Sequence, residues 1–399
     1  MAPRRPSSAF RISNYDPQAL VPLLKSQLPY SIPLLRRLQH DLAYPSPTAK
    51  ILTTFTGAET PASPWLAAYV DLFAGRETQI VIYSSLEADA TSPVIDGEFV
   101  SALHAPREFL DQARAQLLAL LSHVKTHLLP DYLSSTQAAT GSTPTTSSLG
   151  QDPVSKHSGL VPPPPPGAFL IGNLHTGLFS MLKTTGEYTH AEPVPGLRIH
   201  RFDNPPYIKY LFRAPSFATG SPDSPDGAPA PLLDVIRFTD KKGRIGVLPH
   251  QYDLIRLRTN VPRSRETLTK LPGVAMYADS KIELQAHPSD NSNAAEGSGN
   301  QPPVGEMPIA WAFLGIDGGL ATLHVEPEYR GQNLALHVSK EAMRRGMAKG
   351  GIWRDRDEEG ETWVHTNVLA SNVASRRVME KLGGEIGWTC TWTVVEYGV

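Results

Sequence analysis

The sequence predicts an α/β fold of the α+β kind, in which strands and helices alternate along the chain. Apolar segments with strand character, such as residues 79–84 and 320–325, are separated by segments whose apolar residues recur at helical spacing, such as residues 108–129. The strand at 320–325 leads through a glycine-containing turn into a helix that extends to Ala348, the kind of connection expected where helices pack against a sheet.

Composition narrows the class of protein. The 399 residues suffice for two domains, and the net charge of −2 gives no overall basic field that would attract nucleic acid. A single cysteine, Cys390, excludes an intrachain disulfide and a cysteine-based zinc site, which fits a reducing compartment. The 13 histidines lack metal-ligand spacing, so no metal is expected.

The sequence predicts a cytoplasmic protein without a membrane partner. No apolar run approaches the roughly 20 residues of a membrane span. The first residues carry Arg4 and Arg5 and no acid before Asp16, so a mitochondrial transit peptide is the alternative. Pro3 and Pro6 argue against the amphipathic helix that such a peptide needs.

Proline-rich and serine-rich stretches divide the chain. Two of them, residues 134–167 and 286–305, are predicted to be disordered inserts. The expected parts are a flexible N-terminus at 1–15, an N-terminal lobe at 16–213, a linker at 214–231 and a C-terminal lobe at 232–399.

The N-terminal lobe should alternate helices and strands. Asn204, Pro205 and Pro206 lie between two apolar segments, which predicts that these segments pair as a hairpin. The expected helices are 17–28, 34–38, 108–129 and 174–184, and the expected strands are 51–56, 79–84, 169–172, 197–202 and 208–212.

The C-terminal lobe should begin with two helices and end on a strand. Ser264 is a candidate N-cap for the second helix. The expected helices are 251–259, 262–271, 334–348 and 372–382, and the expected strands are 273–277, 281–284, 308–314, 320–325, 362–369 and 388–395.

The turn at residues 330–333 predicts an anion site. The first amides of the helix that follows have no intrahelical partners, and the helix dipole adds about half a positive charge there. Gly331 lets an anion approach the backbone closely. For the turn alone, a purely steric role of the glycine is the alternative.

Two motifs carry a resemblance to a known family. Residues 325–335 read Val-x-Pro-x-Tyr-Arg-Gly-x-x-Leu-Ala, and residues 372–383 hold Asn-x-x-Ser followed by Glu-Lys-Leu-Gly. Together they resemble two signatures of the GNAT N-acetyltransferase superfamily, in a fungal-type form of its glycine N-acyltransferase-like branch. The resemblance implies a mixed central sheet of the GNAT type in a catalytic C-terminal domain, and a degenerate GNAT-like N-terminal lobe. It also implies that the strands at 320 and 362 run parallel and splay apart.

The resemblance assigns an acyl-CoA site to this chain. It implies that the pyrophosphate is held by the backbone amides of Gly331, Gln332, Asn333, Leu334 and Ala335, with added charge from Arg330. Leu323 and Val325 would pair with the pantetheine arm, which Asn372 would also bind. An N-cap role is the alternative for Asn372, and helix packing is the alternative for Ser375, the last candidate for the CoA site.

Three departures from the family pattern concern the chemistry. Asn333 stands where a glycine is frequent, Met379 where a tyrosine is frequent, and Gly319 where the related branch has a glutamate base. The remaining catalytic candidates are His324, whose ordinary pKa near 6.5 suits a base, and Glu326 at the end of the strand. A packed histidine and a solvated turn carboxylate are the alternatives.

The leading prediction is an acyl-CoA-dependent N-acyltransferase. Acetyl-CoA is the default donor, a larger acyl group stays open, and a primary amine of a small molecule or amino acid would attack the thioester directly in a ternary complex. No nucleic-acid partner is expected. A non-catalytic acyl-CoA-binding protein is the alternative, because Met379 and Gly319 remove two proton-transfer groups.

Overall fold

The computed structural model describes residues 10–57, 61–89, 94–95, 98–141, 161–214, 236–259, 261, 263–278, 306–357, 359–360 and 362–398. The insert expected at 286–305, the strand expected at 281–284 and residues 215–231 of the expected linker lie outside this part of the chain.

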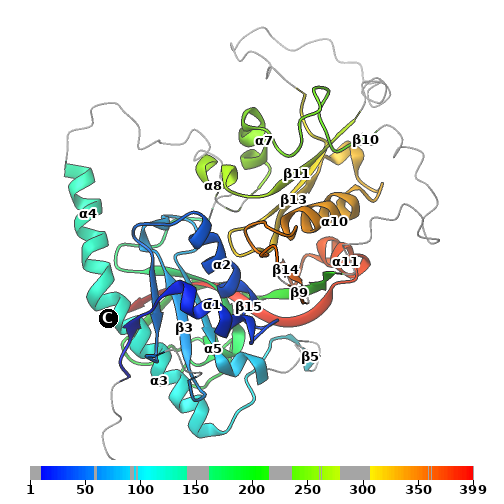
Figure 1. The fold of residues 1–399 in the computed structure, drawn as a ribbon. Coiled ribbons are helices and arrows are strands. Elements are labelled where there is room, and N and C mark those ends of the chain that lie inside the picture. Colours follow the sequence, from blue (N-terminus) through cyan, green and yellow to red (C-terminus); the bar gives the residue numbers. More distant parts are fainter. Residues whose placement is uncertain are drawn as a thin grey trace, which may run out of the picture.

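The α/β fold with a mixed sheet is confirmed (Figure 1). In the N-terminal half the strands are β1 (Ser13–Asn14), β2 (Lys50–Thr53), β3 (Leu66–Val70), β4 (Ile80–Ser84), β5 (Val94–Ile95), β6 (Glu98–Phe99), β7 (Phe169–His175), β8 (Leu197–Phe202) and β9 (Tyr207–Arg213). The helices are α1 (Pro17–Lys25), α2 (Ile32–Ala43), α3 (Arg107–His123), α4 (Leu129–Gly141) and α5 (Thr176–Ser180).

The C-terminal half has the order β-α-α-β-β-β-α-β-α-β, in which a short strand, β10, precedes the two expected helices. Its strands are β10 (Ile236–Arg237), β11 (Gly273–Ala278), β12 (Ala310–Leu314), β13 (Leu320–Val325), β14 (Trp363–Leu369) and β15 (Glu385–Tyr397). Its helices are α7 (Tyr252–Leu257), α8 (Arg265–Thr269), α10 (Leu334–Gly346) and α11 (Val373–Lys381).

Helix α4 extends into the predicted insert. A π-helical turn, Val124–Leu128, joins α3 to α4, which continues to Gly141. The helix therefore covers the first residues of the segment predicted as disordered, and residues 142–160 of that segment lie outside the described part of the chain.

The two halves exchange strands. The larger sheet has the order β1-β2-β3-β4-β7-β15-β9-β14, with β8 also paired to β15, and β10-β11-β12-β13 forms a second sheet. The first part of β15 pairs with β9, and its last part pairs with β7 and β8 (Figure 1, red). In turn, β9 from the N-terminal half lies between β14 and β15. One strand from each half thus completes the sheet of the other.

The predicted hairpin of residues 197–202 and 208–212 is wrong. Both segments are strands, but β8 and β9 each pair with β15 instead of with each other. Two adjacent strands and a proline turn give a local signal for a hairpin, whereas the 13-residue β15, some 170 positions later, offers both strands a longer ladder.

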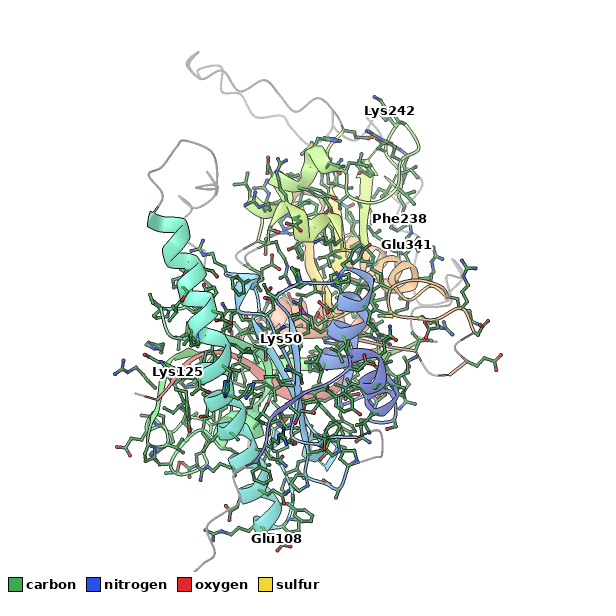
Figure 2. All side chains as sticks on the ribbon, turned by 60° about the vertical axis from the view of Figure 1, so that its left-hand side comes forward. Lys50, Glu108, Lys125, Phe238, Lys242 and Glu341 are labelled. Atoms are coloured by element: carbon green, nitrogen blue, oxygen red, sulfur yellow. The ribbon has the colours of Figure 1, made fainter. Side chains whose placement is uncertain are left out.

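Side chains of alternating direction build the N-terminal core. Leu66, Ala68 and Val70 of β3 pack toward α3, while Ala67 and Tyr69 pack toward α1 and α2. This period of two places an apolar cluster on each face of the sheet. Figure 2 shows α3 running along one side, with Glu108 near its start and Lys125 in the π-helical turn.

The C-terminal sheet is covered in the same way. Ala310, Ala312 and Leu314 of β12 pack against α10, while Trp311 and Phe313 pack against α7 and α8. Where the β10 segment meets α10, the Arg345 guanidinium lies 5.8 Å from the ring centre of Phe238 and binds Glu341 at 2.5 Å (Figure 2).

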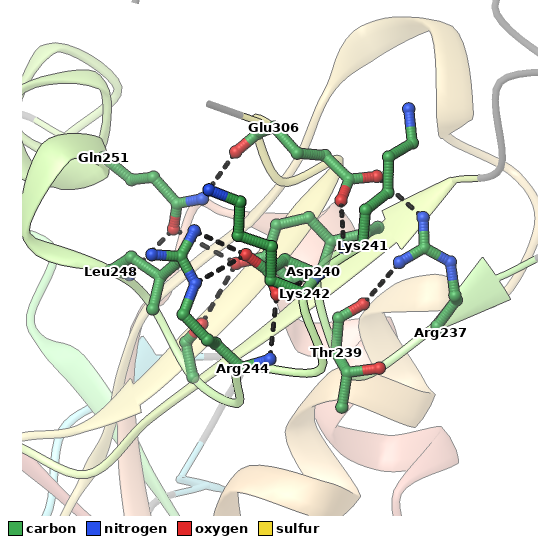
Figure 3. Close-up of polar contacts among 11 residues, drawn as sticks. Arg237, Thr239, Asp240, Lys241, Lys242, Arg244, Leu248, Gln251 and Glu306 are labelled. Atoms are coloured by element: carbon green, nitrogen blue, oxygen red, sulfur yellow. Dashed lines mark hydrogen bonds and ion pairs between the residues drawn. The ribbon is translucent and has the colours of Figure 1, made fainter. Parts of the chain in front are cut away.

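A network of hydrogen bonds and ion pairs holds the segment that leads into α7 (Figure 3). Glu306 accepts from the Arg237 guanidinium and from the amide of Lys241, both at 2.7 Å. The carbonyl of Glu306 accepts from the side chain of Gln251, at the entrance to α7, again at 2.7 Å. Asp240 closes the neighbouring turn by accepting from Arg244 at 2.8 Å. These contacts anchor α7 above β11–β13.

Direct contacts also bind the halves to each other. The Arg36 guanidinium of α2 donates to the carbonyl of Trp353 at 2.5 Å, and the Trp353 indole donates back to the carbonyl of Arg36 at 3.1 Å. Glu77, just before β4, accepts from the amide of Ser264 and the hydroxyl of Thr267 at the start of α8. The predicted N-cap Ser264 accepts from the amide of Thr267.

Candidate active site

Strands β13 and β14 run parallel but are joined at only one end. Gly319 and His365 form an isolated parallel bridge, and the hydroxyl of Thr366 donates to the carbonyl of Leu320 at 2.7 Å. Among the described residues no ladder continues beyond these contacts, and the two strands belong to different sheets. The inner edge of β13 is therefore left without a neighbouring strand.

A β-bulge bends β13 near the point where the strands part. Trp311 of β12 lies opposite His324, whereas Phe313 lies opposite Ala321, so β13 holds one extra residue between these pairs. Thr322 accommodates it with a φ of 54°, a left-handed conformation that is rare for a β-branched residue. Bulges of this kind change the direction of a strand and of its side chains.

The unpaired edge of β13 presents the backbone of the predicted pantetheine-binding residues. The amide of Glu326 donates to the carbonyl of Ile309 on the β12 side. Backbone groups alternate in direction along a strand, so those of Leu323 and Val325 point to the open side. The carbonyl of Val325 is indeed reached there by the Arg330 side chain, at 3.0 Å.

Two left-handed residues shape the turn that follows. After a 3-10 turn at Pro327–Tyr329, Gly331 has a φ of 79° and Asn333 a φ of 60°. Asparagine tolerates this region better than other side chains, so Asn333 maintains the turn where the family pattern has glycine. α10 then begins at Leu334 with Asn333 as its N-cap.

The turn leaves five consecutive backbone amides free. The first hydrogen bonds of α10 run from the amides of Leu336 and His337 to the carbonyl of Asn333. Within the described residues, the amides of 331–335 have no protein acceptor. The first turn of α10 contains no acidic residue, and no atom lies within 4 Å of a Cβ placed on Gly331. An anion can approach this turn from solvent.

The side chains of the turn differ in exposure. Arg330 and Asn333 are exposed, Gln332 and Ala335 are half-buried, and Leu334 packs into the core. The side-chain oxygen of Gln332 is buried and has no partner within the described structure. Leu334 thus anchors the turn in the core, while the backbone amides of the turn have no protein acceptor within the described structure.

His324 and Glu326 form a cluster with the residue that follows α7 and one from β12. The imidazole Nε2 of His324 lies 3.5 Å from one carboxylate oxygen of Glu326, and the other oxygen accepts from the Arg258 guanidinium at 3.1 Å. The Trp311 ring stacks on the imidazole, with ring centres 4.5 Å apart. The structure therefore brings the two predicted catalytic residues together and adds Arg258 and Trp311.

The environment of His324 favours a neutral imidazole. Burial lowers the pKa of His324 below its ordinary value, although the Glu326 carboxylate acts in the opposite direction. If the Nε2 proton faces Glu326, the Nδ1 lone pair is free to accept a proton. Nε2 makes no hydrogen bond within the described structure, so the arrangement is that of a general base with a carboxylate 3.5 Å away.

Asn372 caps α11. Its side-chain oxygen accepts from the amide of Ser375 at 3.1 Å, so the N-cap alternative is realised. The oxygen is engaged in this bond, and Asn372 is exposed while Ser375 is half-buried. The side-chain amide of Asn372 retains its donors for another partner.

Two of the three positions that depart from the family pattern, Met379 and Gly319, have no proton-transfer group. Met379 is 2% exposed and packs in the core of the C-terminal half. A Cβ on Gly319 would lie 2.9 Å from Cε1 of His365 and 3.2 Å from the carboxylate of Asp317. The His365 ring therefore occupies the space that a side chain at position 319 would need.

Arg258 and Trp311 were not predicted from the sequence. Arg258 precedes Glu326 by 68 positions, and no local spacing connects them. Pairing the residues of β12 and β13 across their hairpin is the signal that could have identified Trp311 as the neighbour of His324. The bulge at Thr322 shifts this pairing by one residue, and the sequence does not reveal the bulge.

Outside this site the described residues line a cavity, but they form neither a metal-ligand group nor a helix that could span a membrane. A cavity of about 640 Å³ lies in the N-terminal half between α3 and α5, and no residue of the turn at 330–335 lines it. The described part of the chain contains no group of three or more His, Cys, Asp or Glu side chains that could hold a metal. None of its helices combines the length and the apolar character of a membrane span.

Comparison with known proteins gives a family. Residues 9–210 match the model described as the N-terminal domain of the acyl-CoA N-acyltransferase verG, and no curated protein matches the chain. A solved Drosophila protein is 13% identical over 96% of this chain and 97% of its own, with a TM-score of 0.50. This likeness concerns the fold over both halves.

Two further solved structures are more distant. A tandem GNAT protein from the clavulanic acid biosynthesis pathway is 9% identical, with 98% of each chain covered and a TM-score of 0.40. A GCN5-related N-acetyltransferase from Kribbella flavida is 11% identical over 58% of this chain and 68% of its own, with a TM-score of 0.30.

Proposed function

The chain belongs to the family of the acyl-CoA N-acyltransferase verG N-terminal domain, whose model covers just over half of it, and on that premise we propose how it transfers an acyl group. It is an acyl-CoA-dependent N-acyltransferase, and its identification in the sequence as a GNAT superfamily member is confirmed. We propose that acetyl-CoA is the donor and that a primary amine of a small molecule or amino acid is the acceptor. The glycine N-acyltransferase-like branch stays a prediction.

The free amides of residues 331–335 carry the proposal for the donor site. Five consecutive free donors at a helix N-terminus suit a pyrophosphate, and the open space around Gly331 admits it. The exposed Arg330 lies at the edge of this turn and adds a positive charge.

From the turn, the arm of the cosubstrate would follow the unpaired edge of β13. The backbone groups of Leu323 and the amide of Val325 are available there in the manner of a neighbouring strand, while the carbonyl of Val325 accepts from Arg330. Asn372, at the N-terminus of α11, offers a side-chain amide to the same arm, and Ser375 lies in the first turn of that helix. The slot between β13 and β14 would therefore hold the thioester.

The acceptor would react on the side of the sheet covered by α7 and α8. His324 lies on this side, because it stacks on Trp311, which packs against those helices. The amine nitrogen attacks the thioester carbonyl, a C–N bond forms, the C–S bond breaks, and one proton moves from nitrogen to Nδ1 of His324. Glu326, held by Arg258, orients the imidazole. The thiolate takes a proton from water, since Met379 has none to give, and the proton received by His324 neutralises the resulting hydroxide.

Acylated products test the function. The protein is incubated with acetyl-CoA, and with longer or aromatic acyl-CoA, against a panel of amines, and products are identified by mass spectrometry while thiol release is followed. We expect thiol release that depends on the amine and matches product formation. Absence of both with every donor and amine would contradict the proposal.

The burial of Met379 and the filled space at Gly319 support a second candidate, a non-catalytic acyl-CoA-binding protein. Titration calorimetry with acetyl-CoA distinguishes the two. Binding without thiol release on any amine favours the second candidate, whereas binding with release favours the enzyme.

A further inference from the structure

A fully buried lysine lies where the two halves exchange strands. Lys209 of β9 is 0% exposed. Its ammonium group donates to Oδ1 of Asn367 at 2.7 Å, to Oδ1 of Asn173 at 2.9 Å and to Nδ1 of His365 at 3.2 Å. All of its N–H donors are therefore matched, and among the described residues no carboxylate lies within 4 Å of it.

The negative charge that balances Lys209 is reached through one intervening side chain. Asp317, in the turn before β13, accepts from the side-chain amide of Asn173 at 2.7 Å. His365 forms a second link, since its Nε2 lies 2.9 Å from the carbonyl oxygen of Asp317. Asn173 and His365 thus bridge a buried cation from the N-terminal half and a carboxylate from the C-terminal half. Leaving such a cation unpaired would be costly, so the whole network acts as a unit.

The backbone of β7 is bent to make one of these links. Asn173 has a φ of 57°, and the register between β7 and β15 shifts at this point. A bulge in a strand redirects a side chain. Here the redirected amide of Asn173 reaches both Lys209 and Asp317.

The network ends at the closed end of the slot. His365 forms the bridge to Gly319, and its ring fits against that glycine with no room for a Cβ. With Nδ1 accepting from Lys209, the neutral ring has its proton on Nε2 and donates to Asp317. Lys209 therefore sets the tautomer and the orientation of the side chain that joins β14 to the start of β13.

We propose that Lys209 is a positioning residue for acyl transfer, which fixes through His365 the point where β13 and β14 part and so sets the width of the slot for the acyl-CoA arm. The proposal rests on the proposed function. It means that the slot of the C-terminal half is completed by a side chain that the N-terminal half contributes on the exchanged strand.

Lys209→Met tests the proposal, because it retains the length of the side chain and removes all donors. We expect kcat/KM for acyl-CoA to fall about 100-fold, as a displacement of reacting groups by about 1 Å produces. Ile208→Val is the control on the same strand, since Ile208 is also fully buried and packs in the apolar core of the C-terminal half. Equal kcat/KM in the two variants, at similar melting temperature, would overturn the proposal.

A double-mutant cycle separates positioning from general destabilisation. If Lys209 acts through His365, the combination of Lys209→Met with His365→Gln loses little more activity than His365→Gln alone. Losses that simply multiply would overturn the proposal.

Should Lys209→Met fail to fold, Asn367→Ala decides, because Asn367 is half-buried and its removal leaves Lys209 in place. We expect a smaller fall in kcat/KM, about tenfold for a single lost hydrogen bond, and no change would overturn the proposal. If the wild-type protein transfers no acyl group, the proposed function fails separately, and the dissociation constant of acetyl-CoA in the same variants still tests the width of the slot.

Discussion

Each half of the molecule contains a parallel strand pair, and the two pairs differ in how far their backbones are joined. In the N-terminal half β4 and β7 pair at two successive positions, Ile80 with Ile171 and Val81 with Gly172, and both strands are buried along their whole length. In the C-terminal half β13 and β14 share one isolated bridge, and β13 is half-buried from Ala321 to Val325.

The ends of β4 and β13 also differ in whether their backbone amides have a protein acceptor. After β13 the chain leaves five amides free at the start of a helix. After β4, the chain's own Glu87 carboxylate accepts from the amide of Ser84 at 2.9 Å. A side chain of the protein itself thus accepts from the backbone at the end of β4, whereas the five amides after β13 have no acceptor among the described residues.

The largest effect is expected from closing the open turn. Gly331→Glu introduces a negative charge and a side chain at the free amides, and we expect the affinity for acetyl-CoA to fall at least about a thousandfold, or ~4 kcal/mol. Calorimetry measures it. Gly196→Glu is the matched control, because Gly196 has the same φ of 79° and open space around it. Both variants share the strain of about 1–2 kcal/mol for a left-handed side chain. Unchanged affinity in Gly331→Glu would contradict the proposal that the free amides of residues 331–335 bind acetyl-CoA.

The next effect concerns Glu87, which accepts a backbone hydrogen bond at the end of β4. Burial raises the pKa of Glu87 to about 8, so the folded protein holds this carboxyl protonated at neutral pH while the unfolded chain releases the proton. Stability from this group is therefore present below the unfolded pKa and is lost as the pH rises toward 8. We expect Glu87→Gln to stabilise the protein by about 3 kcal/mol at pH 7, and to weaken the fall of stability with pH.

Urea unfolding at several pH values measures the effect of Glu87→Gln. Glu108→Gln, at the exposed start of α3, is the control that should change neither value. An equal pH dependence in Glu87→Gln and the wild type would show that Glu87 is ionised in both states.

The third effect separates binding from chemistry in the open half. His324→Gln should lower kcat about 100-fold while the KM for acyl-CoA stays within about twofold, because the imidazole transfers a proton and does not hold the donor. His127→Gln, on the exposed π-helical turn, is the control. A large increase in KM with unchanged kcat would place His324 in donor binding instead.

The smallest effect is a shift in the pH profile. Activity that needs neutral His324 is lost as the pH falls through its pKa, and burial holds that pKa below the ordinary value of 6.5. Glu326 raises this pKa, so Glu326→Gln should move the acid limb of kcat/KM to lower pH, with Glu328→Gln as the exposed neighbour for comparison. A shift to higher pH would contradict the assignment of the limb to His324.

Local residues decide much of the open half. Gly331 and Asn333 are among the residue types that enter left-handed backbone without great strain, and Leu334 anchors the helix behind them. Such a turn depends on neighbours in the chain, so it is visible in the sequence. The N-cap role of Asn372 was likewise foreseen as an alternative, because its partner is three positions away.

What the residues alone determined is therefore the strand, the turn and the helix at residues 320–346, since each rests on short-range backbone preferences. Only the tertiary structure decided that β8 and β9 pair end to end along one edge of β15, that Arg258 holds Glu326 beside His324, and that Lys209 of the N-terminal half reaches His365 of the C-terminal half. These contacts link positions 68 to 200 residues apart. Their formation depends on which strands find the longest ladder and which buried charge finds a partner, and no spacing along the chain records either.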